Sequence, residues 1–344
     1  MSSRTTENKL VLIKRKTRLE ELVVRYNTIQ QAEFYIQRLG ADFSDYIQED
    51  ITYRSAVETA VIELGAVGMV QVLEREHVPN FIFGDDDTVV VLGQDGLVAN
   101  TLKYLKHQPL IGVNPDPRRW DGVLLPFQVQ DLRLVVADVF KGRRQVREVT
   151  LAKAELNDGQ SLYGVNDLFI GRKTHVSARY QLELNGVAEQ QSSSGIIVST
   201  GMGSTGWLKS VLAGAAGIAR GAAQLRGAVP AGQAEQGAGE QQPGARAARD
   251  SSQQPQSKAA EEQERQAWGA PHLYFTVREP FPSRTTTADL VFGMISDEQR
   301  LRITSQMPEN GVIFSDGVES DFLEFNSGVE ASIGLAEKRG RLVV

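Results

Sequence analysis

The sequence predicts an α/β half followed by a β-rich half. Between residues 10 and 113, short apolar runs alternate with stretches whose apolar residues recur at helical spacing. From about residue 145 onward the pattern changes to short runs of β-branched and aromatic residues separated by turn sequences. We therefore expect an N-terminal α/β domain over residues 1–125 and a C-terminal β-rich domain over residues 126–344.

In the first half we expect a sheet covered by helices. Thr88 to Leu92 and Leu110 to Val113 are continuous apolar runs, typical of parallel strands that are buried on both faces. Because strands and helices alternate, right-handed crossovers should join these strands. The predicted strands are 10–14, 80–83, 88–92 and 110–113, and the predicted helices are 18–39, 54–75, 97–106 and 128–140.

The second half contains turn sequences between its apolar runs, among them Asn185-Gly186 and Asp316-Gly317. Such pairs are typical of tight turns between antiparallel strands. The predicted strands are 145–154, 164–170, 180–184, 195–199, 290–294, 301–304, 312–315 and 329–335.

Residues 221–266 depart from both patterns. They consist mainly of Gly, Ala, Gln, Glu, Arg and Ser and contain almost no large apolar side chains. Such a segment cannot bury enough surface to offset the entropy lost on ordering. We expect a flexible low-complexity insertion on the surface, with some transiently helical segments.

Composition excludes several classes of function. The net charge of −6 argues against a nucleic-acid surface, and no apolar run approaches the roughly 20 residues that span a bilayer. The chain has no cysteine, and its four histidines lack the spacing of a zinc site, so we expect no metal held by the protein alone. Residues 1–8 lack the apolar region of a secretory signal, so a cytoplasmic location is expected.

A first candidate site is the turn Gly93-Gln94-Asp95-Gly96, between a predicted buried strand and a predicted helix. In an open α/β sheet, ligands bind at such turns. Asp95 has two interpretations: a helix cap or turn residue, or a carboxylate that takes a proton from a hydroxyl during phosphoryl transfer.

A second candidate is Asn166-Asp167, which precedes an apolar strand. The pair could simply form a turn, or its amide and carboxylate could bind ribose hydroxyls. Ser315-Asp316-Gly317 leaves a similar choice between a hairpin turn and a site.

The third candidate is the glycine-rich stretch from Ser194 to Trp207, in which a β-branched strand runs into a turn and then a helix. Small residues let a ligand approach the backbone, and the start of a helix offers free N–H groups to an anion. Residues 201–206 match G-x-G-x-x-G, but no buried strand follows them, so a dinucleotide fold is not indicated. Two interpretations of residues 201–206 therefore remain: a loop that contacts phosphate or ribose, or simply the end of a strand.

Taken together and in order, these segments resemble the NAD kinase family, in particular the branch that includes the mitochondrial-type enzyme and bacterial relatives often labelled sugar kinases. The matching stretches are 93–96, 111–117, 165–171, 193–207, 277–280 and 315–317. The resemblance implies an N-terminal α/β (Rossmann-like) domain and a C-terminal β-rich domain, with the active site between them. It also implies transfer of a phosphoryl group from ATP, or in some members polyphosphate, with Mg²⁺, to the adenosine ribose 2′-hydroxyl of NAD.

The resemblance also implies roles for individual residues. Asp95 would be the general base. The other residues implied to bind nucleotide are Gly93, Gln94 and Gly96 in the first turn, Asn166 and Asp167 at the acceptor, and Thr200, Gly203, Ser204 and Thr205 in the glycine-rich loop. The partners implied are small-molecule nucleotides and further copies of the chain.

Two departures from the family motif Gly-Gly-Asp-Gly-Thr concern the donor site. Gln94 stands in place of the second glycine and Leu97 in place of the threonine, so a side chain could block phosphate and one hydrogen-bond donor is lost. Asp167 stands where glutamate is more usual. The departures at Gln94 and Leu97 keep one alternative open, a nucleotide-binding regulator without turnover. The insertion leaves a third hypothesis, an assembly module that docks a partner through residues 221–266.

Overall fold

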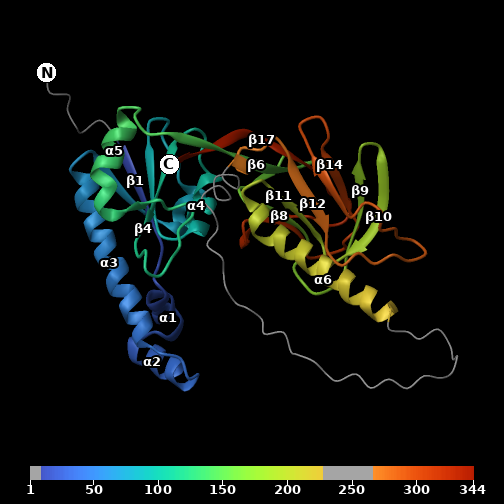
Figure 1. The fold of residues 1–344 in the computed structure, drawn as a ribbon, viewed down its shortest axis with the longest axis horizontal. Coiled ribbons are helices and arrows are strands. Elements are labelled where there is room, and N and C mark those ends of the chain that lie inside the picture. Colours follow the sequence, from blue (N-terminus) through green and yellow to red (C-terminus); the bar gives the residue numbers. More distant parts are fainter. Residues whose placement is uncertain (1–8, 228–265) are drawn as a thin grey trace, which may run out of the picture.

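The computed structural model describes residues 9–227 and 266–344, and within them the strands form one sheet of eleven and one of six (Figure 1). The main path of the large sheet is β10-β9-β14-β17-β4-β3-β1-β2, with β5, β6 and β7 attached to it. The small sheet has the order β13-β12-β11-β8-β15-β16 and is antiparallel throughout. The expected combination of an α/β half and a β-rich half is confirmed.

The N-terminal half contains the parallel part of the large sheet. Its strands are β1 (Lys9–Lys14), β2 (Met69–Glu74), β3 (Thr88–Leu92), β4 (Pro109–Asn114) and β5 (Phe127–Gln128). Its helices are α1 (Arg18–Tyr26), α2 (Ile29–Arg38), α3 (Ser44–Gly65), η1 (Arg75–Asn80), α4 (Asp95–Leu102), η2 (Val129–Asp131) and α5 (Leu132–Phe140). β1 pairs with β2 on one side and β3 on the other, so the chain changes direction across the sheet between β1 and β3.

The C-terminal half supplies the antiparallel strands of both sheets. They are β6 (Val146–Leu156), β7 (Ser161–Gly164), β8 (Asp167–Arg172), β9 (Ala178–Leu184), β10 (Val187–Ser193), β11 (Ile196–Ser199), β12 (Leu273–Val277), β13 (Phe292–Ile295), β14 (Leu301–Ser305), β15 (Gly311–Ser315), β16 (Val318–Glu324) and β17 (Glu330–Val343). η3 (Gly203–Thr205) and α6 (Trp207–Gly227) follow β11.

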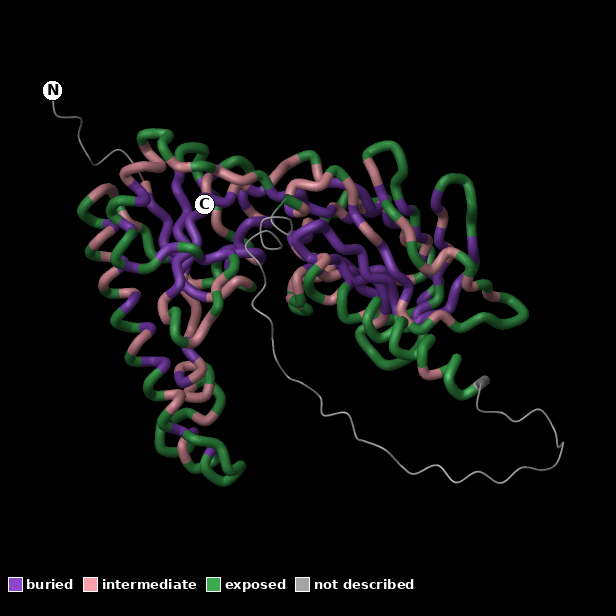
Figure 2. The backbone as a smooth tube through the Cα atoms, viewed as in Figure 1, coloured by how far each residue is buried: buried purple, intermediate pink, exposed green. Residues whose placement is uncertain are grey.

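The two halves are not separate bodies, because β17 belongs to both. Near the C-terminus Arg341 and Leu342 pair in parallel with Pro109 and Leu110 of β4, while most of β17 pairs with β6 and β14. Buried strands therefore run continuously from one half into the other (Figure 2). This pairing fixes the N-terminal sheet relative to the C-terminal strands.

Three sequence expectations about local structure were wrong. The helix expected over 18–39 is two helices, because Thr28 caps a new start at Ile29. The helix expected over 54–75 ends at Gly65 and is followed by the edge strand β2. Because Met69 and Val72 of β2 are exposed apolar residues, the sequence does not show the apolar–polar alternation expected of a strand. Residues 80–83 form no strand, because η1 and extended coil connect β2 to β3 there.

Part of the expected insertion is described. Residues 221–227 continue α6, so this part is helical, while residues 228–265 lie outside the described residues. None of the helices in the described part of the chain is both long and apolar enough to cross a membrane.

Candidate active site

A cavity of about 510 Å³ opens where the chain changes direction between β1 and β3. Arg15 and Lys16 follow β1 and line it, as does Arg75, which follows β2. Asn100 and other residues of α4 form a further wall, and Asp321 of β16 closes it from the C-terminal half. An open α/β sheet binds its ligand at the carboxyl ends of strands at such a switch point. The cavity is therefore a crevice between the halves at the expected edge of the sheet.

The end of α4 is tied to the C-terminal half. Lys103, which is 3% exposed, donates from Nζ to Ser315 Oγ and to Asp321 Oδ2, both at 3.0 Å. Tyr104 also donates to Asp321, and Lys338 Nζ donates to the carbonyl oxygens of Lys103 and Leu105. Buried and partly buried polar contacts of this kind stabilise one arrangement. They therefore fix α4, which begins with Asp95.

Asp95 does not act as the cap of α4. It is the first residue of the helix, after Gln94 at the cap position. Its Oδ1 accepts a hydrogen bond of 2.8 Å from the backbone N–H of Leu124, in the loop after β4. The side chain is half-buried and held in place by this bond. The capping interpretation is therefore not what the geometry shows, and the proposed base is oriented toward that loop.

The structure gives a physical reason why Gln94 and Leu97 can stand in the first turn, where the family motif has glycine and threonine. The backbone at Gln94 is extended, with φ −125° and ψ 162°, a conformation that any residue adopts. Leu97 is buried, and its Cδ2 would lie 2.9 Å from a Cβ at Gly93. Leu97 thus fills the space that Gly93 leaves and belongs to the core. Gly96 has open space beside its Cα, since a Cβ added there would have no contact within 4 Å.

Asn166 and the glycine-rich bend are bound to each other. Thr200 N donates to Asn166 O at 2.9 Å, and Thr200 Oγ1 donates to Val165 O at 2.6 Å. Gly203 N donates to Thr200 Oγ1 at 3.1 Å, and a Cβ at Gly203 would lie 2.0 Å from Asn166 O. The bend therefore needs glycine at 203 to approach the start of β8. Three of the predicted site residues, Asn166, Thr200 and Gly203, lie together.

Ser204 and Thr205, the other predicted site residues of the bend, differ in whether their hydroxyls are free to bind a ligand. Ser204 Oγ donates to Gly201 O at 2.7 Å, so its hydroxyl serves the bend itself. Thr205 is exposed at the end of η3, next to the start of α6. Of the two hydroxyls, that of Thr205 is therefore the one more open to a ligand.

Asp316 joins this group, although the sequence left it between a turn and a site. It occupies the tight turn between β15 and β16 with φ 54°. Its Oδ1 accepts from the backbone N–H groups of Val165, Asn166 and Asp167 at 3.1, 2.6 and 3.3 Å. Burial raises the pKa of Asp316, and Lys103 and the three N–H groups oppose that rise. Asp316 therefore holds the Asn166-Asp167 pair in place.

Asp167 is a second acid in this group whose pKa is raised. Its residue is 8% exposed, and no hydrogen bond or ion pair of its carboxylate is recorded within the described residues. Burial raises the pKa of Asp167 to about 7, and the neighbouring charge of Asp316 adds to this effect. A buried carboxyl group that titrates near neutral pH is a functional candidate on physical grounds.

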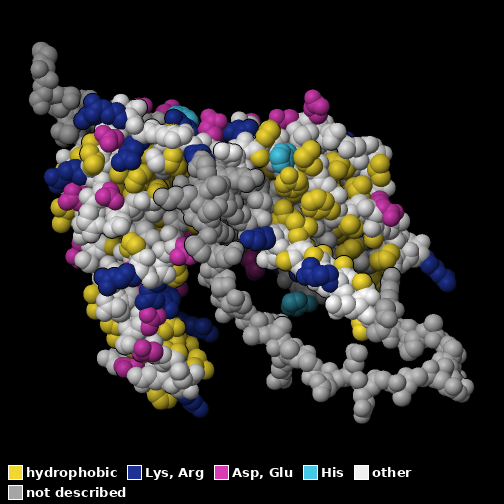
Figure 3. Space-filling model, viewed as in Figure 1, with side chains coloured by type: hydrophobic (Ala, Val, Ile, Leu, Met, Phe, Trp, Pro, Cys, Tyr) yellow, Lys and Arg dark blue, Asp and Glu magenta, His cyan; other side chains and the backbone are white. Residues whose placement is uncertain are grey.

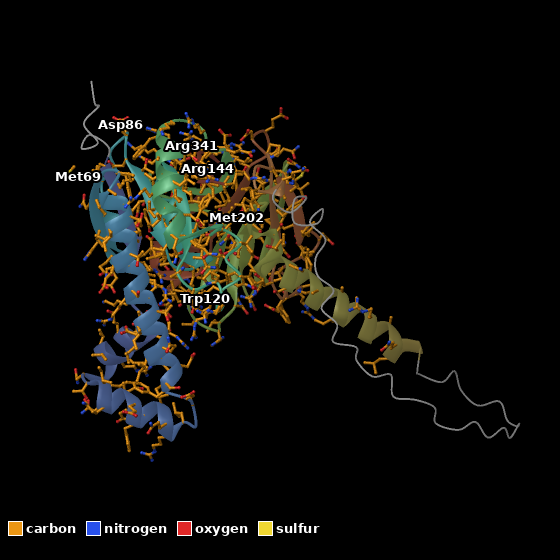
Figure 4. All side chains as sticks on the ribbon, turned by 60° about the vertical axis from the view of Figure 1, so that its left-hand side comes forward. Met69, Asp86, Trp120, Arg144, Met202 and Arg341 are labelled. Carbon is orange, nitrogen blue, oxygen red and sulfur yellow. The ribbon has the colours of Figure 1, made fainter. Side chains whose placement is uncertain are left out.

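Met202 connects the bend to the N-terminal half. It lies in the middle of the molecule, where the halves meet (Figure 4), and it belongs to one buried cluster with Leu97, Leu124 and Val165. Leu124 is the residue whose N–H bonds Asp95. The bend, the start of β8 and the loop that holds Asp95 thus adjoin one hydrophobic core, although no direct contact of Asp95 with Asn166 or Asp167 is recorded among the described residues.

Solved structures share this architecture. An NAD kinase from Archaeoglobus fulgidus, solved in complex with ATP, matches with a TM-score of 0.53 and 14% identity, over 98% of this chain and 93% of that one. The chain has an NAD kinase-like fold. Yeast NADH kinase, solved with NADH, matches with a TM-score of 0.50 and 14% identity, over 98% of this chain and 83% of that one. No family model matches the sequence, and no curated protein matches it.

Proposed function

We propose that this protein is an NAD kinase-like phosphotransferase. It would move a phosphoryl group from ATP to the 2′-hydroxyl of NAD or to a related nucleoside or sugar hydroxyl. The observation that carries the proposal is the hydrogen-bonded group of Asn166, Thr200 and Gly203, with Asp167 held beside Asn166 by Asp316. In a chain with an NAD kinase-like fold, these residues offer an amide, a carboxylate and close backbone to an acceptor ribose.

In this proposal Asp95 takes the proton of the acceptor hydroxyl. Leu124 N–H holds Oδ1, and no partner of Oδ2 is recorded among residues 9–227 and 266–344, so Oδ2 is the basic oxygen. The acceptor oxygen forms a bond to the terminal phosphorus, the phosphoanhydride bond breaks, and ADP leaves. Phosphoryl transfer depends chiefly on positioning and charge stabilisation, so the turn 93–96 and the bend 200–205 contribute beside the base.

The donor would occupy the crevice at the switch point. Its wall includes Leu97, Asn100 and Thr101 of α4, whereas Asp95 is bonded to a different neighbour, Leu124. The turn Gly93–Gly96 leads into α4, the helix that forms this wall. No cluster of three or more His, Asp or Glu that could hold a metal exists in the described part of the chain. Mg²⁺ would then enter mainly through donor phosphates, as this ion commonly does.

The direct test is product formation. Purified protein is incubated with Mg²⁺, NAD and either ATP or polyphosphate, and NADP is measured; nucleosides and sugars serve as further acceptors. We expect NADP or a phosphorylated analogue from at least one donor. Absence of product from every donor and acceptor would remove the proposed activity.

A regulator that binds nucleotide without turnover is the second candidate, and Leu97 favours it. Its side chain is packed in the core, so it supplies no hydrogen bond to phosphate. This candidate predicts that NAD or ATP raises the melting temperature while no product forms.

Asp167 makes acceptor binding dependent on pH. An ionised carboxylate accepts hydrogen bonds from hydroxyls more strongly than a protonated one. Because the pKa of Asp167 is about 7, the affinity for NAD is expected to rise between pH 6 and pH 8. Isothermal titration calorimetry measures this, and Asp167→Asn should flatten the profile. A profile that is already flat in the unaltered protein would refute the role.

Ionisation of Asp167 should also affect the stability of the fold, in the opposite direction. Raising the pH should lower the free energy of unfolding. The pKa of Asp167 in the folded protein lies above its ordinary value of 3.8, so the native state holds the proton more tightly. The resulting stabilisation is present below about pH 4 and is lost as the pH rises through about 7. In chemical denaturation, Asp167→Asn should be more stable than the unaltered protein at pH 8 and similar to it at pH 4.

We also propose that the chain self-associates and that it is located in the cytoplasm. β13 is an edge of the small sheet, and its Phe292 and Met294 are 50% and 48% exposed. Hydrophobic side chains gather over the β12–β14 side of this half (Figure 3). An open edge with apolar neighbours favours pairing with a second copy. Phe292→Arg should therefore shift the sedimentation profile toward the monomer; an unchanged profile would exclude this surface.

A further inference from the structure

The loop between β4 and β5 (residues 115–126) contacts Asp95 through the backbone of Leu124. The N–H group of Leu124 donates to Asp95 Oδ1 at 2.8 Å. The carbonyl of the same residue lies against Gly112 of β4, because a Cβ on that glycine would lie 2.0 Å from Leu124 O. The position of this loop therefore decides how the Asp95 carboxylate is oriented.

The first part of the loop is a turn closed by Asn114, the last residue of β4. Asn114 Nδ2 donates to Trp120 O at 2.9 Å, and the N–H groups of Arg119 and Trp120 donate to Asp116 O at 3.0 and 3.1 Å. Gly122 has φ +64°, and a Cβ there would lie 2.6 Å from Asn114 Nδ2. These contacts shape the turn, but they all lie within the loop and the end of β4.

Arg119 attaches the turn to the start of α3. Its Nη1 donates to Asp45 Oδ2 at 3.1 Å, and its Nη2 donates to Asp45 Oδ1. This two-point contact fixes the plane of the guanidinium as well as its distance. The two side chains are 23% and 44% exposed, and an isolated ion pair this exposed would contribute little. The pair is not isolated.

Asp45 belongs to a chain of ion pairs that ends in the interior. Arg18 of α1 donates from Nη2 to Asp45 Oδ2 at 2.7 Å and from Nε to Glu49. Glu49 is 4% exposed and also accepts from Arg15 Nη2 at 2.7 Å. The guanidinium groups of Arg119 and Arg18 hold the pKa of Asp45 well below its ordinary value. Linked charges of this kind hold their geometry better than a single surface pair.

The network joins the helical part of the N-terminal half to the loop. α1 and α2 lie beside α3, beyond the end of the parallel strands (Figure 1). Arg119 is the link from these helices to the turn, and Leu124 is the link from the loop to Asp95. A side chain that contacts no reacting group can thus influence the candidate base.

We infer that Arg119 is a positioning residue: its pairing with Asp45 holds the loop so that Leu124 N–H orients Asp95 for proton transfer. The inference rests on the proposed function, because it gives this contact a consequence for catalysis. Holding one carboxylate oxygen leaves the other in a fixed direction toward the acceptor hydroxyl, and transfer rates depend steeply on such alignment.

Arg119→Ala should lower kcat about tenfold or more and leave the KM for NAD nearly unchanged. A displacement of about 1 Å at a reacting group can cost about 10²-fold in rate. NAD binding is assigned to Asn166 and Asp167, which lie outside the loop, so the affinity should remain. Arg119→Lys keeps one charged donor for Asp45 and should recover part of the rate.

Arg118→Ala is the matched control. Arg118 is exposed and lies next to Arg119 in the same turn; its recorded bond is made by the backbone N–H, to Asp116 Oδ1 at 3.2 Å. The substitution removes the same charge from the loop and leaves the pairing with Asp45 intact. We expect the kcat and the melting temperature of the unaltered protein.

A double-mutant cycle separates positioning from general support of the fold. If Arg119 acts through Asp95, adding Arg119→Ala to the Asp95→Asn protein should lower kcat no further, because the base is already lost. A merely structural role would give the same fold-loss in both backgrounds. Equal losses would therefore overturn the inference, as would a kcat of Arg119→Ala equal to that of Arg118→Ala.

Amide hydrogen exchange measures the hold on the loop without any turnover. In Arg119→Ala, residues 120–125 should exchange faster than in the unaltered protein, while β3 should exchange at the same rate. Unchanged exchange over residues 120–125 would overturn the inference whether or not the protein is active. Absence of product from the unaltered protein, with faster exchange in Arg119→Ala, would remove the proposed function and leave the hold of Arg119 on the loop established.

Discussion

Replacing Asp95 with asparagine is expected to lower the rate of phosphoryl transfer by about 10²–10⁴-fold, the range typical of a lost general base. Asparagine keeps an oxygen that can accept from Leu124 N–H, so the loop and α4 should stay in place. The affinity for NAD should therefore change little. Steady-state kinetics gives kcat, and calorimetry gives the affinity.

A matched control for this variant is Asp85→Asn. The side chain of Asp85 is 78% exposed, and its recorded contact is a 4.0 Å approach to His107. We expect unchanged kcat and unchanged affinity. If Asp95→Asn keeps the same kcat as Asp85→Asn, Asp95 is not the base. If Asp95→Asn lowers the affinity for NAD together with kcat, Asp95 serves to bind NAD.

Gly203→Ala should have the largest effect on the candidate acceptor site. The added Cβ would lie 2.0 Å from Asn166 O and 2.9 Å from Ser199 Oγ, distances that require the backbone to move. Overpacking of this kind typically costs about 1–3 kcal/mol of unfolding free energy. The displacement would also separate the bend from Asn166 and Asp167. We expect a lower melting temperature and loss of NAD binding.

Gly214→Ala, in the helix α6 that follows the bend, provides the control. Its added Cβ would have no contact within 4 Å. Stability and NAD affinity should therefore stay close to those of the unaltered protein. If both alanine variants behave alike, close packing at Gly203 is not what holds the site together.

Continuous runs of apolar residues, which are visible in the local sequence, made part of the fold predictable. β3 and β4 are continuous apolar runs that helices cover, and the sequence places them to within one residue at each end. β2 escaped recognition because its exposed Met69 and Val72 break the alternation expected of a strand. The pairing of β17 with β4 joins residues more than 200 positions apart, which no local pattern encodes.

The candidate site was predictable only in part, for a similar reason. Asn166, Thr200 and Gly203 carry recognisable sequence signals, and the structure places them together through backbone hydrogen bonds. Asp316 looked like an ordinary hairpin turn, which it also is, and its three bonds to residues 165–167 depend on the pairing of β15 with β8. Lys103 gave no signal, because its burial follows from the approach of Ser315 and Asp321.

A crystal structure of the protein with NAD bound would show whether Asp95 reaches the acceptor hydroxyl. We expect the adenosine ribose to lie between Asp95 and the Asn166-Asp167 pair, with its 2′-oxygen within about 3.2 Å of an Asp95 carboxylate oxygen. A ribose bound elsewhere, with Asp95 still bonded only to Leu124, would contradict this expectation.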